Sequence, residues 1–340
     1  MTSDALIAWQ FRVFAALSAV LPALLKQYAD QSAPHALMIS GQFGAGKATL
    51  AGLLARALLC EAAGQRPCGA CSGCRKTQSL SHPNLLQVRA AEKQRSVKVE
   101  QARNLIASLA SYPFETGPRV VLLGLVDTFT VQAQNALLKA VEEPDSATYF
   151  LLTCQNEQAV LSTIRSRCRK VRLPDWPDAL ITQVLIQQGI PGDEAARLTA
   201  LAQGSPGKAL QIKEDASFWA AKQLADETLL AITDLEQLPE ASARLRDARD
   251  MADIILDYVQ GAALRLVRDT ALDPDAGLRA QRLLESVLTA RKFQASNLSW
   301  QAIADWMLLT IIKENTIYAK CNQRTYPQHG RTAIHIPRQA

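Results

Sequence analysis

The sequence has few aromatic residues and no long apolar run. Phe, Trp and Tyr make up 6% of its 340 residues, and this scarcity, beside abundant Ala and Leu, favours helix over sheet. No apolar stretch approaches the roughly 18 residues that a transmembrane helix needs. Residues 14–25 are apolar but contain Pro22 and lack a small-residue cleavage site, so we expect an amphipathic helix there and not a signal peptide. These absences indicate a cytoplasmic protein, whose seven cysteines are kept reduced or bound to metal.

A large excess of charge of either sign is also absent. Lys and Arg number 37 against 32 Asp and Glu, which gives a formal net charge of +5. Such a mild excess is compatible with a position near nucleic acid, but a slightly basic solvated surface is the simpler interpretation. Hydrophobic residues at 48% and charged residues at 20% exclude a largely disordered chain, and the length predicts two or three domains.

The stretch 39–50, I-S-G-Q-F-G-A-G-K-A-T-L, lacks one hydroxyl of a complete phosphate loop. It otherwise fits G-x-x-x-x-G-K-[ST], in which glycines let backbone N–H groups surround the phosphates and the lysine reaches the outer ones. The matching residues are Gly41, Gly44, Gly46 and Lys47. Ala48 stands where a Ser or Thr would coordinate Mg²⁺, and Thr49 follows one residue later, turned by roughly 100° on a helix. The sequence therefore predicts a degenerate phosphate loop.

The neighbouring strand lacks the carboxylate that a phosphate-loop ATPase needs. Such an enzyme uses acids at the strand end to hold Mg²⁺ and to orient the attacking water. Here the apolar run 119–125, R-V-V-L-L-G-L, ends at Gly124 and Leu125. Asp127 follows, and we interpret it as a turn or helix-cap residue and not as a metal ligand. Because both losses affect the same ion, the sequence argues against Mg·ATP hydrolysis by this chain alone.

Apolar runs and helical patterns alternate over the first half of the chain. Strands are expected at 36–40, 119–125 and 148–153, with helices at 49–59 and 131–141. An alternation of this kind predicts a parallel sheet that helices cover on both faces.

The second half of the chain reads as helical. The prolines of V-R-L-P-D-W-P, residues 171–177, mark a boundary. Short helices at 178–188 and 193–203 then precede the turn 204–207, and helical spacing continues to about Tyr318. The tail from residue 320 is basic and without an acidic residue, and we expect it to be disordered.

Four cysteines follow the phosphate-loop helix in the spacing C-x7-C-x2-C-x2-C. They are Cys60, Cys68, Cys71 and Cys74. A tetrahedral zinc site needs four ligands, with thiolate sulfurs about 2.3 Å from the metal, and C-x2-C lets two of them meet one ion across a tight turn. Four thiolates leave no open coordination position, so we interpret this set as a structural Zn²⁺ site. An iron–sulfur cluster and unbound thiols are the alternatives.

Three further motifs carry a family resemblance. They are N-A-L-L-K at 135–139, E-E-P at 142–144 and S-R-C at 166–168. Together with the cysteine insert and the turn G-S-P-G-K-A-L at 204–210, they resemble the clamp-loader branch of the AAA+ ATPases. The resemblance covers about residues 5–215 by motif, and the C-terminal third only by helical composition and length.

The resemblance implies an α/β fold class in three parts. The first is an AAA+ P-loop domain at 1–173 with a parallel sheet and a zinc-binding insert at about 60–75. A small helical lid domain at 174–213 and an all-helical collar domain at 214–319, which assembles a ring, would follow. Residues 320–340 would be the disordered basic tail.

The resemblance also implies a role for Arg167, the arginine of S-R-C. It would be an arginine finger that acts in trans, on charge that develops at a neighbouring subunit's ATP. Without the motif, an exposed arginine would be interpreted as a surface ion pair. Lys208 stands where the family's second sensor helix usually brings an arginine, which further weakens the case for chemistry at this chain's own loop. The implied protein is a stator that hydrolyses no ATP itself, within a DNA polymerase III holoenzyme.

The implied partners are the delta and gamma/tau subunits of a hetero-oligomeric ring, and more weakly the sliding clamp and primed DNA. A basic cluster near a predicted helix start could meet DNA phosphates, although a solvated basic face fits nearly as well. Its members are Lys93, Arg95, Lys98 and Arg103. One alternative is an active gamma/tau-like ATPase in which Thr49 or water replaces the missing Mg²⁺ ligand. Another, a zinc-dependent nucleic-acid-binding module, explains the cysteines but not the AAA+ motifs.

Overall fold

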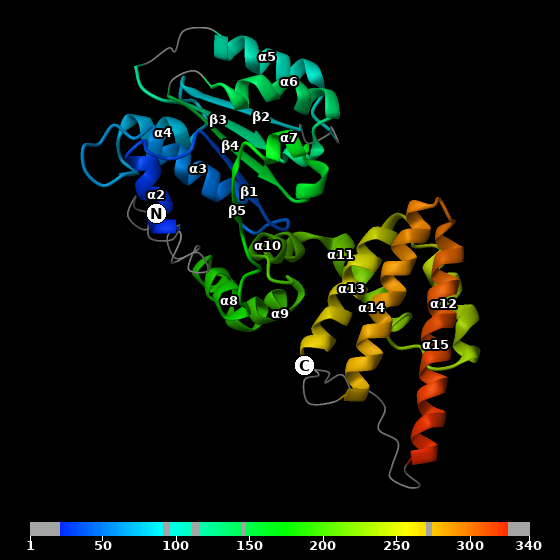
Figure 1. The fold of residues 1–340 in the computed structure, drawn as a ribbon. Coiled ribbons are helices and arrows are strands. Elements are labelled where there is room, and N and C mark those ends of the chain that lie inside the picture. Colours follow the sequence, from blue (N-terminus) through cyan, green and yellow to red (C-terminus); the bar gives the residue numbers. More distant parts are fainter. Residues whose placement is uncertain (1–20, 91–95, 111–115, 145–146, 270–273, 326–340) are drawn as a thin grey trace. The chain divides into compact units, whose positions relative to one another are not determined.

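The computed structural model describes residues 21–90, 96–110, 116–144, 147–269 and 274–325. The chain divides into two compact units, Met1–Gln211 and Ile212–Ala340, each described by itself below (Figure 1). None of the helices in the described ranges is both long and apolar enough to cross a membrane.

The first unit is built on a five-stranded sheet in which all neighbouring strands are parallel. Its order is β2-β3-β4-β1-β5. The strands are β1 (Ala36–Ser40), β2 (Leu85–Arg89), β3 (Arg119–Gly124), β4 (Thr148–Cys154) and β5 (Arg169–Arg172). Every residue of β1 and β4 is buried, as expected for central strands covered on both faces. The strands expected from the sequence at β1, β3 and β4 are thus present, and β2 and β5 form the two edges.

Helices cover both faces of this sheet. The elements between the strands are α3 (Lys47–Leu58), α4 (Ser72–Gln78), α5 (Val99–Ala110), the 3₁₀ turn η2 (Val126–Thr128), α6 (Val131–Glu142), η3 (Glu157–Ala159) and α7 (Ser162–Arg165). α5 and α6 pack on one face, while α3 packs against β1, β3 and β4 on the other (Figure 1). The helix α2 (Leu21–Ala29) packs against α3. α2 includes residues 21–25 of the apolar helix that the sequence predicts at 14–25, and residues 14–20 lie outside the described ranges.

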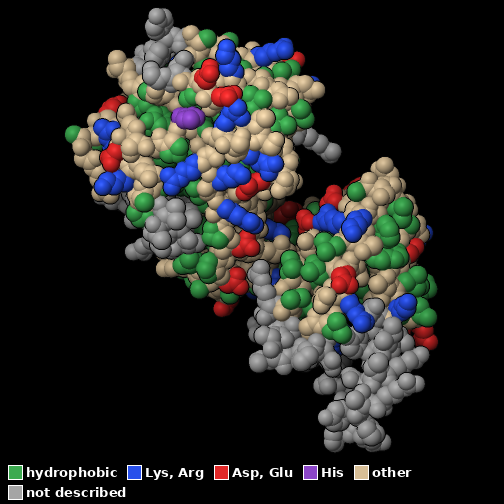
Figure 2. Space-filling view, in the orientation of Figure 1, with side chains coloured by type: hydrophobic (Ala, Val, Ile, Leu, Met, Phe, Trp, Pro, Cys, Tyr) green, Lys and Arg blue, Asp and Glu red, His purple; other side chains and the backbone are tan. Residues whose placement is uncertain are grey.

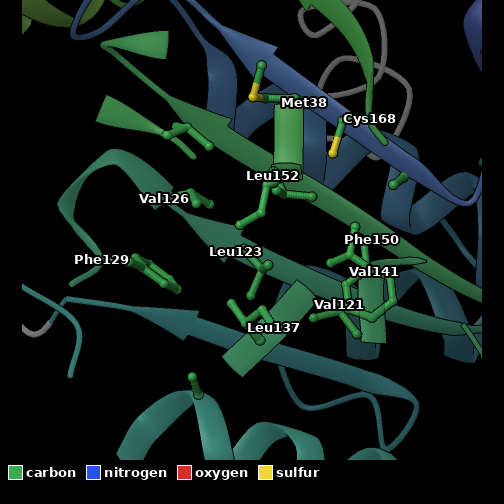
Figure 3. Close-up of a cluster of buried hydrophobic side chains, with 14 of the residues drawn as sticks. Met38, Val121, Leu123, Val126, Phe129, Leu137, Val141, Phe150, Leu152 and Cys168 are labelled. Atoms are coloured by element: carbon green, nitrogen blue, oxygen red, sulfur yellow. The ribbon is translucent and has the colours of Figure 1, made fainter. Parts of the chain in front are cut away.

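The core between the sheet and α5/α6 is apolar throughout. Figure 3 shows side chains of three strands, among them Met38, Leu123 and Phe150, in one apolar cluster with Leu137 and Val141 of α6. Residues two apart on a strand share a face, so the continuous apolar runs of β1, β3 and β4 supply this core and the α3 face at once. This packing fixes the strand ends, from which the candidate site is built.

Three short helices complete the first unit. They are α8 (Asp178–Gln187), α9 (Gly192–Leu201) and α10 (Pro206–Glu214), the last of which ends beyond the unit boundary. Residues 174–208 contact the phosphate loop, as described below. A separate lid domain at 174–213 stays a prediction.

The described part of the second unit is entirely helical. Its elements are α11 (Ala216–Glu227), η4 (Leu235–Gln237), α12 (Leu238–Arg246), η5 (Arg249–Met251), α13 (Ala252–Asp269), α14 (Pro274–Ala295) and α15 (Trp300–Thr325). Ile255 and Val259 of α13 lie in its core with Met307 of α15. Ala263 of the same helix is buried, whereas Leu266 is 47% exposed. α15 continues past Tyr318 to Thr325, and residues 326–340 of the expected tail lie outside the described ranges.

Candidate functional site

The phosphate loop joins the buried strand β1 to α3, in the strand–loop–helix order that such a loop requires. Gly44 and Gly46 have φ angles of 70° and 97°, in the left-handed region that favours glycine. Gly46 is the N-cap of α3 and has no side chain, so no N-cap side chain bonds the first N–H groups of the helix. The backbone shape predicted from the glycine spacing is present.

The Lys47 side chain turns back onto the loop itself. Its Nζ donates to the carbonyl oxygens of Gly41 at 2.8 Å and Gln42 at 2.7 Å. The residue is only 6% exposed. Burial lowers the pKa of the Lys47 amine from its usual value, and the charge of Asp127 acts in the opposite direction. The amine that would bind outer phosphates therefore bonds to carbonyls of its own loop.

The next three carbonyl oxygens of the loop also accept hydrogen bonds, all from residues 174–208. The pairs are Ser205 Oγ to Phe43 O at 2.7 Å, Gly207 N to Gly44 O at 3.1 Å and Trp176 Nε1 to Ala45 O at 3.2 Å. The Gln42 side chain adds bonds to Asp175 Oδ1 and Gln203 O. Every loop carbonyl from residue 41 to residue 45 thus has a donor, which fixes the loop to the segment that carries α10.

The approach of this segment is close enough to require glycine. A Cβ on Gly207 would lie 2.6 Å from Gly44 Cα, and a Cβ on Gly44 would lie 2.4 Å from Ser205 Oγ. Lys208 follows at the start of α10, where its Nζ donates to Gln203 Oε1 at 3.1 Å. The turn 204–207 noted in the sequence therefore packs directly on the phosphate loop.

The residues around the expected Mg²⁺ position lie at the start of α3 and after the end of β3. Ala48 lies in the first turn of α3, Gly124 ends β3, and Leu125 follows with a positive φ of 54°. Asp127, in η2, accepts from the N–H groups of Gln155 and Asn156 through its Oδ2, at 3.1 and 3.0 Å. It therefore links the end of β3 to the end of β4. Its buried Oδ1 has no hydrogen-bond partner within the described ranges.

A polar cavity of about 720 Å³ opens beside the loop, at the ends of β1, β4 and β5. Its lining includes Gln42, Glu157, Arg172 and Asp175, but not Lys47. The Glu157 carboxylate accepts from the Ser40 hydroxyl at 2.6 Å. The cavity thus borders the start of the phosphate loop, at Gly41 and Gln42, and does not reach Lys47.

The four cysteines of the insert converge on one point. Their sulfurs all lie within 4.8 Å of one another, with Cys60 and Cys71 at 3.8 Å and Cys68 and Cys74 at 4.0 Å. Sulfurs about 2.3 Å from a tetrahedral Zn²⁺ are separated by roughly 3.8 Å, so the set fits this ion. The cluster could therefore hold a metal such as zinc without rearrangement of its backbone.

Backbone N–H groups support the same cluster. Cys68, Cys71 and Cys74 donate their N–H groups to the sulfur of the preceding cysteine in the cluster, at 3.4, 3.4 and 3.3 Å. Such donors lower the pKa of Cys68 to about 6, whereas burial raises the pKa values of Cys60 and Cys74. A metal ion would favour the thiolate form of all four.

Arg167 lies just after α7 with its guanidinium partly accessible. One terminal nitrogen forms an ion pair with Glu142 Oε1 at 2.5 Å, and the other donates to Thr163 O at 2.9 Å. The Arg167 side chain is 34% exposed. Glu142 ends α6 and the exposed Glu143 is its C-cap. The E-E-P and S-R-C motifs are thus brought together in space, although the sequence reading treated them separately.

Gln134 is a residue that the sequence reading missed. It is 1% exposed, and its side chain bridges two connections of the unit. Its amide nitrogen donates to Phe129 O and Ala159 O at 3.2 and 3.1 Å, and its oxygen accepts from Leu161 N at 2.8 Å. Leu161 is the N-cap of α7, so Gln134 helps to fix where the turn that carries Arg167 begins. The signal for Gln134 in the sequence is a polar residue on the otherwise apolar face of α6.

The basic cluster is only partly described. Lys93 and Arg95 lie outside the described ranges, whereas Lys98 and Arg103 are exposed at and within α5. Figure 2 shows Lys and Arg side chains in a band across the first unit, interrupted by acidic ones. This mixture does not distinguish a DNA-binding face from a solvated one.

Comparisons with known proteins show similarity over about the first half of the chain. Residues 17–177 match the family model described as "DNA polymerase III, delta subunit". The DNA polymerase III subunit delta' of Yersinia pestis is 35% identical over 197 residues, which cover 52% of this chain and 58% of the relative. That of Escherichia coli K12 is 30% identical over 208 residues, covering 61% and 62%. The Haemophilus influenzae subunit tau/gamma is 30% identical over 217 residues, covering 62% and 31%.

The matches span little more than half of the delta' relatives. Among solved structures, a gamma-subunit-related protein of Thermotoga maritima covers 87% of this chain and 99% of its own, with a TM-score of 0.45 and 14% identity. A likeness at this TM-score is too weak to support an inference about this chain. The parallel sheet, in which β1 leads through the phosphate loop into α3, is an α/β fold of the P-loop type. Residues 17–177 are thus similar to the family described above, and the relatives that match the chain include delta' subunits.

Proposed function

We propose that this chain is a delta' subunit of a DNA polymerase III clamp loader that hydrolyses no ATP itself. It would help to load the sliding clamp onto primed DNA in the cytoplasm. The observation that carries the non-hydrolysing role is the Lys47 amine, which donates to the carbonyls of Gly41 and Gln42. The names of the relatives support the clamp-loader assignment.

Three features of the loop and of the neighbouring strand end argue against hydrolysis at this site. An ammonium has three donors, and two of those of Lys47 are used within the loop, so the amine would have to give up both bonds to reach outer phosphates. Ala48 supplies no Mg²⁺ ligand, and neither Gly124 nor Leu125 supplies a carboxylate at the strand end. A gamma/tau-like ATPase would need a Mg²⁺ ligand at the position of Ala48 or a carboxylate at the end of β3.

Arg167 is proposed to act at the neighbour's nucleotide. A guanidinium can bind a phosphoryl group through two parallel hydrogen bonds and stabilise charge that develops there in the transition state. The Glu142–Arg167 pair is partly exposed, and pairs of this kind contribute about 0–1 kcal/mol. The Arg167 guanidinium can therefore exchange the Glu142 carboxylate for a phosphate at little cost in free energy.

The remaining parts would hold the ring together. We propose that the cysteine cluster binds one structural Zn²⁺, which cross-links the insert between α3 and β2. Residues 174–213 would form a lid fixed to the phosphate loop, and the helices of 214–319 a collar. The partners would be delta and gamma/tau subunits, with clamp and DNA contacts weaker or indirect.

The test is reconstitution of a clamp-loader complex with this chain or its Arg167→Ala variant. We expect no ATPase from the chain alone. At the neighbouring site that faces Arg167, we expect the variant to slow DNA-stimulated hydrolysis by at least about tenfold, since arginine fingers contribute roughly 10³–10⁵ in rate. Clamp loading should fall with it.

Two variants separate the finger from assembly. Arg167→Lys keeps the charge but not the planar fork, and should restore only part of the activity. Arg197→Ala removes an exposed arginine on α9 and should change nothing. Normal activity of an assembled Arg167→Ala complex would overturn the finger, and Mg·ATP turnover by the chain alone, lost in Lys47→Ala, would overturn the non-hydrolysing role.

A further inference from the structure

Asp127 is a carboxylate near the end of β3 that has no part in the function proposed above. It lies in η2, three residues after Gly124, close to where a phosphate-loop ATPase carries its metal-binding acids. Its Oδ2 accepts from the backbone N–H groups of Gln155 and Asn156, at 3.1 and 3.0 Å. Asp127 is therefore bonded to the chain directly after β4 ends.

Gln155 and Asn156 begin the connection from β4 to β5, and this connection carries Arg167. We call residues 155–167 the finger segment. Its backbone is hydrogen-bonded through η3 and α7 up to Arg167, whose N–H donates to Ile164 O at 3.1 Å. Hydrogen-bonded turns restrict the φ and ψ angles of the residues within them. The place where the finger segment starts therefore affects where Arg167 lies.

The start of the finger segment is anchored from both sides of β4, which lies between β3 and β1 in the sheet. Asp127 forms the anchor on the β3 side, where η2 also contacts η3. On the β1 side the Ser40 hydroxyl donates to Glu157 Oε1 at 2.6 Å. Val160 and Ile164 bury their side chains in the core, but apolar contacts are not directional. The hydrogen bonds at its start therefore determine how the segment is oriented.

We propose that Asp127 is a positioning residue for Arg167, an anchor that fixes the start of the finger segment and thereby the place from which the guanidinium reaches a neighbour's nucleotide. The proposal rests on the arginine finger proposed above. Hydrogen bonds from N–H groups to a carboxylate are roughly twice as strong as those between neutral groups. A misplacement of about 1 Å caused far from the chemistry can cost about 10²-fold in rate, so loss of this anchor should be measurable.

Three roles for Asp127 differ in what they require of its side chain. Positioning requires an acceptor for the two N–H groups, which an Asn oxygen can also supply. Metal binding at this chain's own loop would require the charge, which Asn lacks. A purely structural role would change stability and leave the rate of the assembled complex unchanged. The Oδ1 of Asp127 is buried without a hydrogen-bond partner within the described ranges, so an Asn amide nitrogen placed there should cost stability.

The experiment measures DNA-stimulated ATPase of the reconstituted clamp-loader complex with Asp127→Ala, Asp127→Asn and the control Asp193→Ala. We expect Asp127→Ala to lower kcat at least roughly fivefold with KM for ATP changed less than about twofold, because Arg167 acts in the transition state. Asp127→Asn should recover most of the rate. Asp193 is exposed on α9, and its removal should have no effect. Urea unfolding of each isolated chain measures stability separately.

A double-mutant cycle with Arg167→Ala separates this proposal from the finger itself. Because Asp127 acts through Arg167, adding Asp127→Ala to Arg167→Ala should lower the rate no further. An assembled Asp127→Ala complex with the full rate would overturn the positioning role while the finger stands, and an additive loss in the double variant would overturn it too. If Asp127→Asn loses as much rate as Asp127→Ala, the charge is what matters and the proposal fails. An Arg167→Ala complex with the full rate would refute the finger. If Asp127→Ala does not fold, Asp127→Ser, whose shorter side chain cannot bond both N–H groups, takes its place under the same criteria.

Discussion

Arg167 and Glu142 come from separate motifs and meet at 2.5 Å, between a terminal guanidinium nitrogen and Oε1. The pair places the proposed finger at the end of α6, where N-A-L-L-K and E-E-P also lie. Because the two side chains are 34% and 48% exposed, the pair orients Arg167 more than it stabilises the fold. A substitution of Glu142 can test whether this residue only orients Arg167.

Glu142→Gln should leave the finger functional. The amide oxygen can still accept from Arg167, while the charge is removed, so we expect the free energy of unfolding to fall by less than about 1 kcal/mol in urea titrations. ATPase of the reconstituted complex should remain within roughly threefold of wild type, whereas Arg167→Ala should lose far more. A Glu142→Gln complex as inactive as Arg167→Ala, yet normally assembled, would mean that the carboxylate itself is required.

Lys47→Met should act on stability and not on ATP turnover. The substitution keeps most of the apolar stem but leaves the Gly41 and Gln42 carbonyls without their Nζ donor, which should cost about 1–3 kcal/mol. Urea unfolding measures this loss, with Lys213→Met, an exposed site on α10, as the control. The complex should retain its ATPase rate. Unchanged stability combined with lost nucleotide binding would show instead that the loop uses Lys47 on a ligand.

Gly207→Ala should loosen the segment that covers the phosphate loop. Its Cβ would meet Gly44 Cα at 2.6 Å, so the backbone of one side must move. Overpacking of this kind costs typically about 1–3 kcal/mol, and hydrogen exchange at residues 204–208 should quicken. Gly52→Ala is the matched control, because its Cβ meets nothing within 4 Å and lies inside α3. That control should stabilise the chain by roughly 0.5–1 kcal/mol.

Removal of the proposed zinc should destabilise the first unit selectively. Stripping the metal with a strong chelator leaves four clustered thiols without their cross-link, and we expect a loss of several kcal/mol, or roughly 10 °C in the thermal midpoint. Circular dichroism should show the helical second unit unaffected, and added Zn²⁺ should restore the transition. Finding iron in the purified chain, or a midpoint indifferent to chelation, would contradict this expectation.

The elements found from sequence are those whose signals are local. β1 and β4 are visible in the sequence because strands covered on both faces have continuous apolar runs. The short spacing of the cysteines likewise predicts the tight turns between them. The edge strands escaped notice for the opposite reason. β2 buries only Leu85 and leaves Gln87 and Arg89 exposed, and β5, R-K-V-R, buries only Val171. Such short half-buried strands have no apolar run to reveal them.

The site contacts that sequence could not reveal are those between distant segments. The glycines of the phosphate loop fixed its shape, but the donors that hold its carbonyls, Trp176, Ser205 and Gly207, lie more than a hundred residues later. Whether Lys47 faces a ligand or its own loop depends on that packing.

Gln134→Leu should misplace Arg167 without touching it. Leucine has a similar volume but leaves Ala159 O and Leu161 N without the partners that Gln134 provides, so the start of α7 loses its link to α6. We expect a loss of about 1–3 kcal/mol in stability. In the reconstituted complex, the maximal ATPase rate should fall with little change in KM, because an interaction that acts only in the transition state is impaired. Gln132→Leu, an exposed position on the same helix, should have neither effect. A destabilised Gln134→Leu chain that still supports the full rate would limit Gln134 to a structural role and leave Thr163 and Glu142 as the contacts that position the finger.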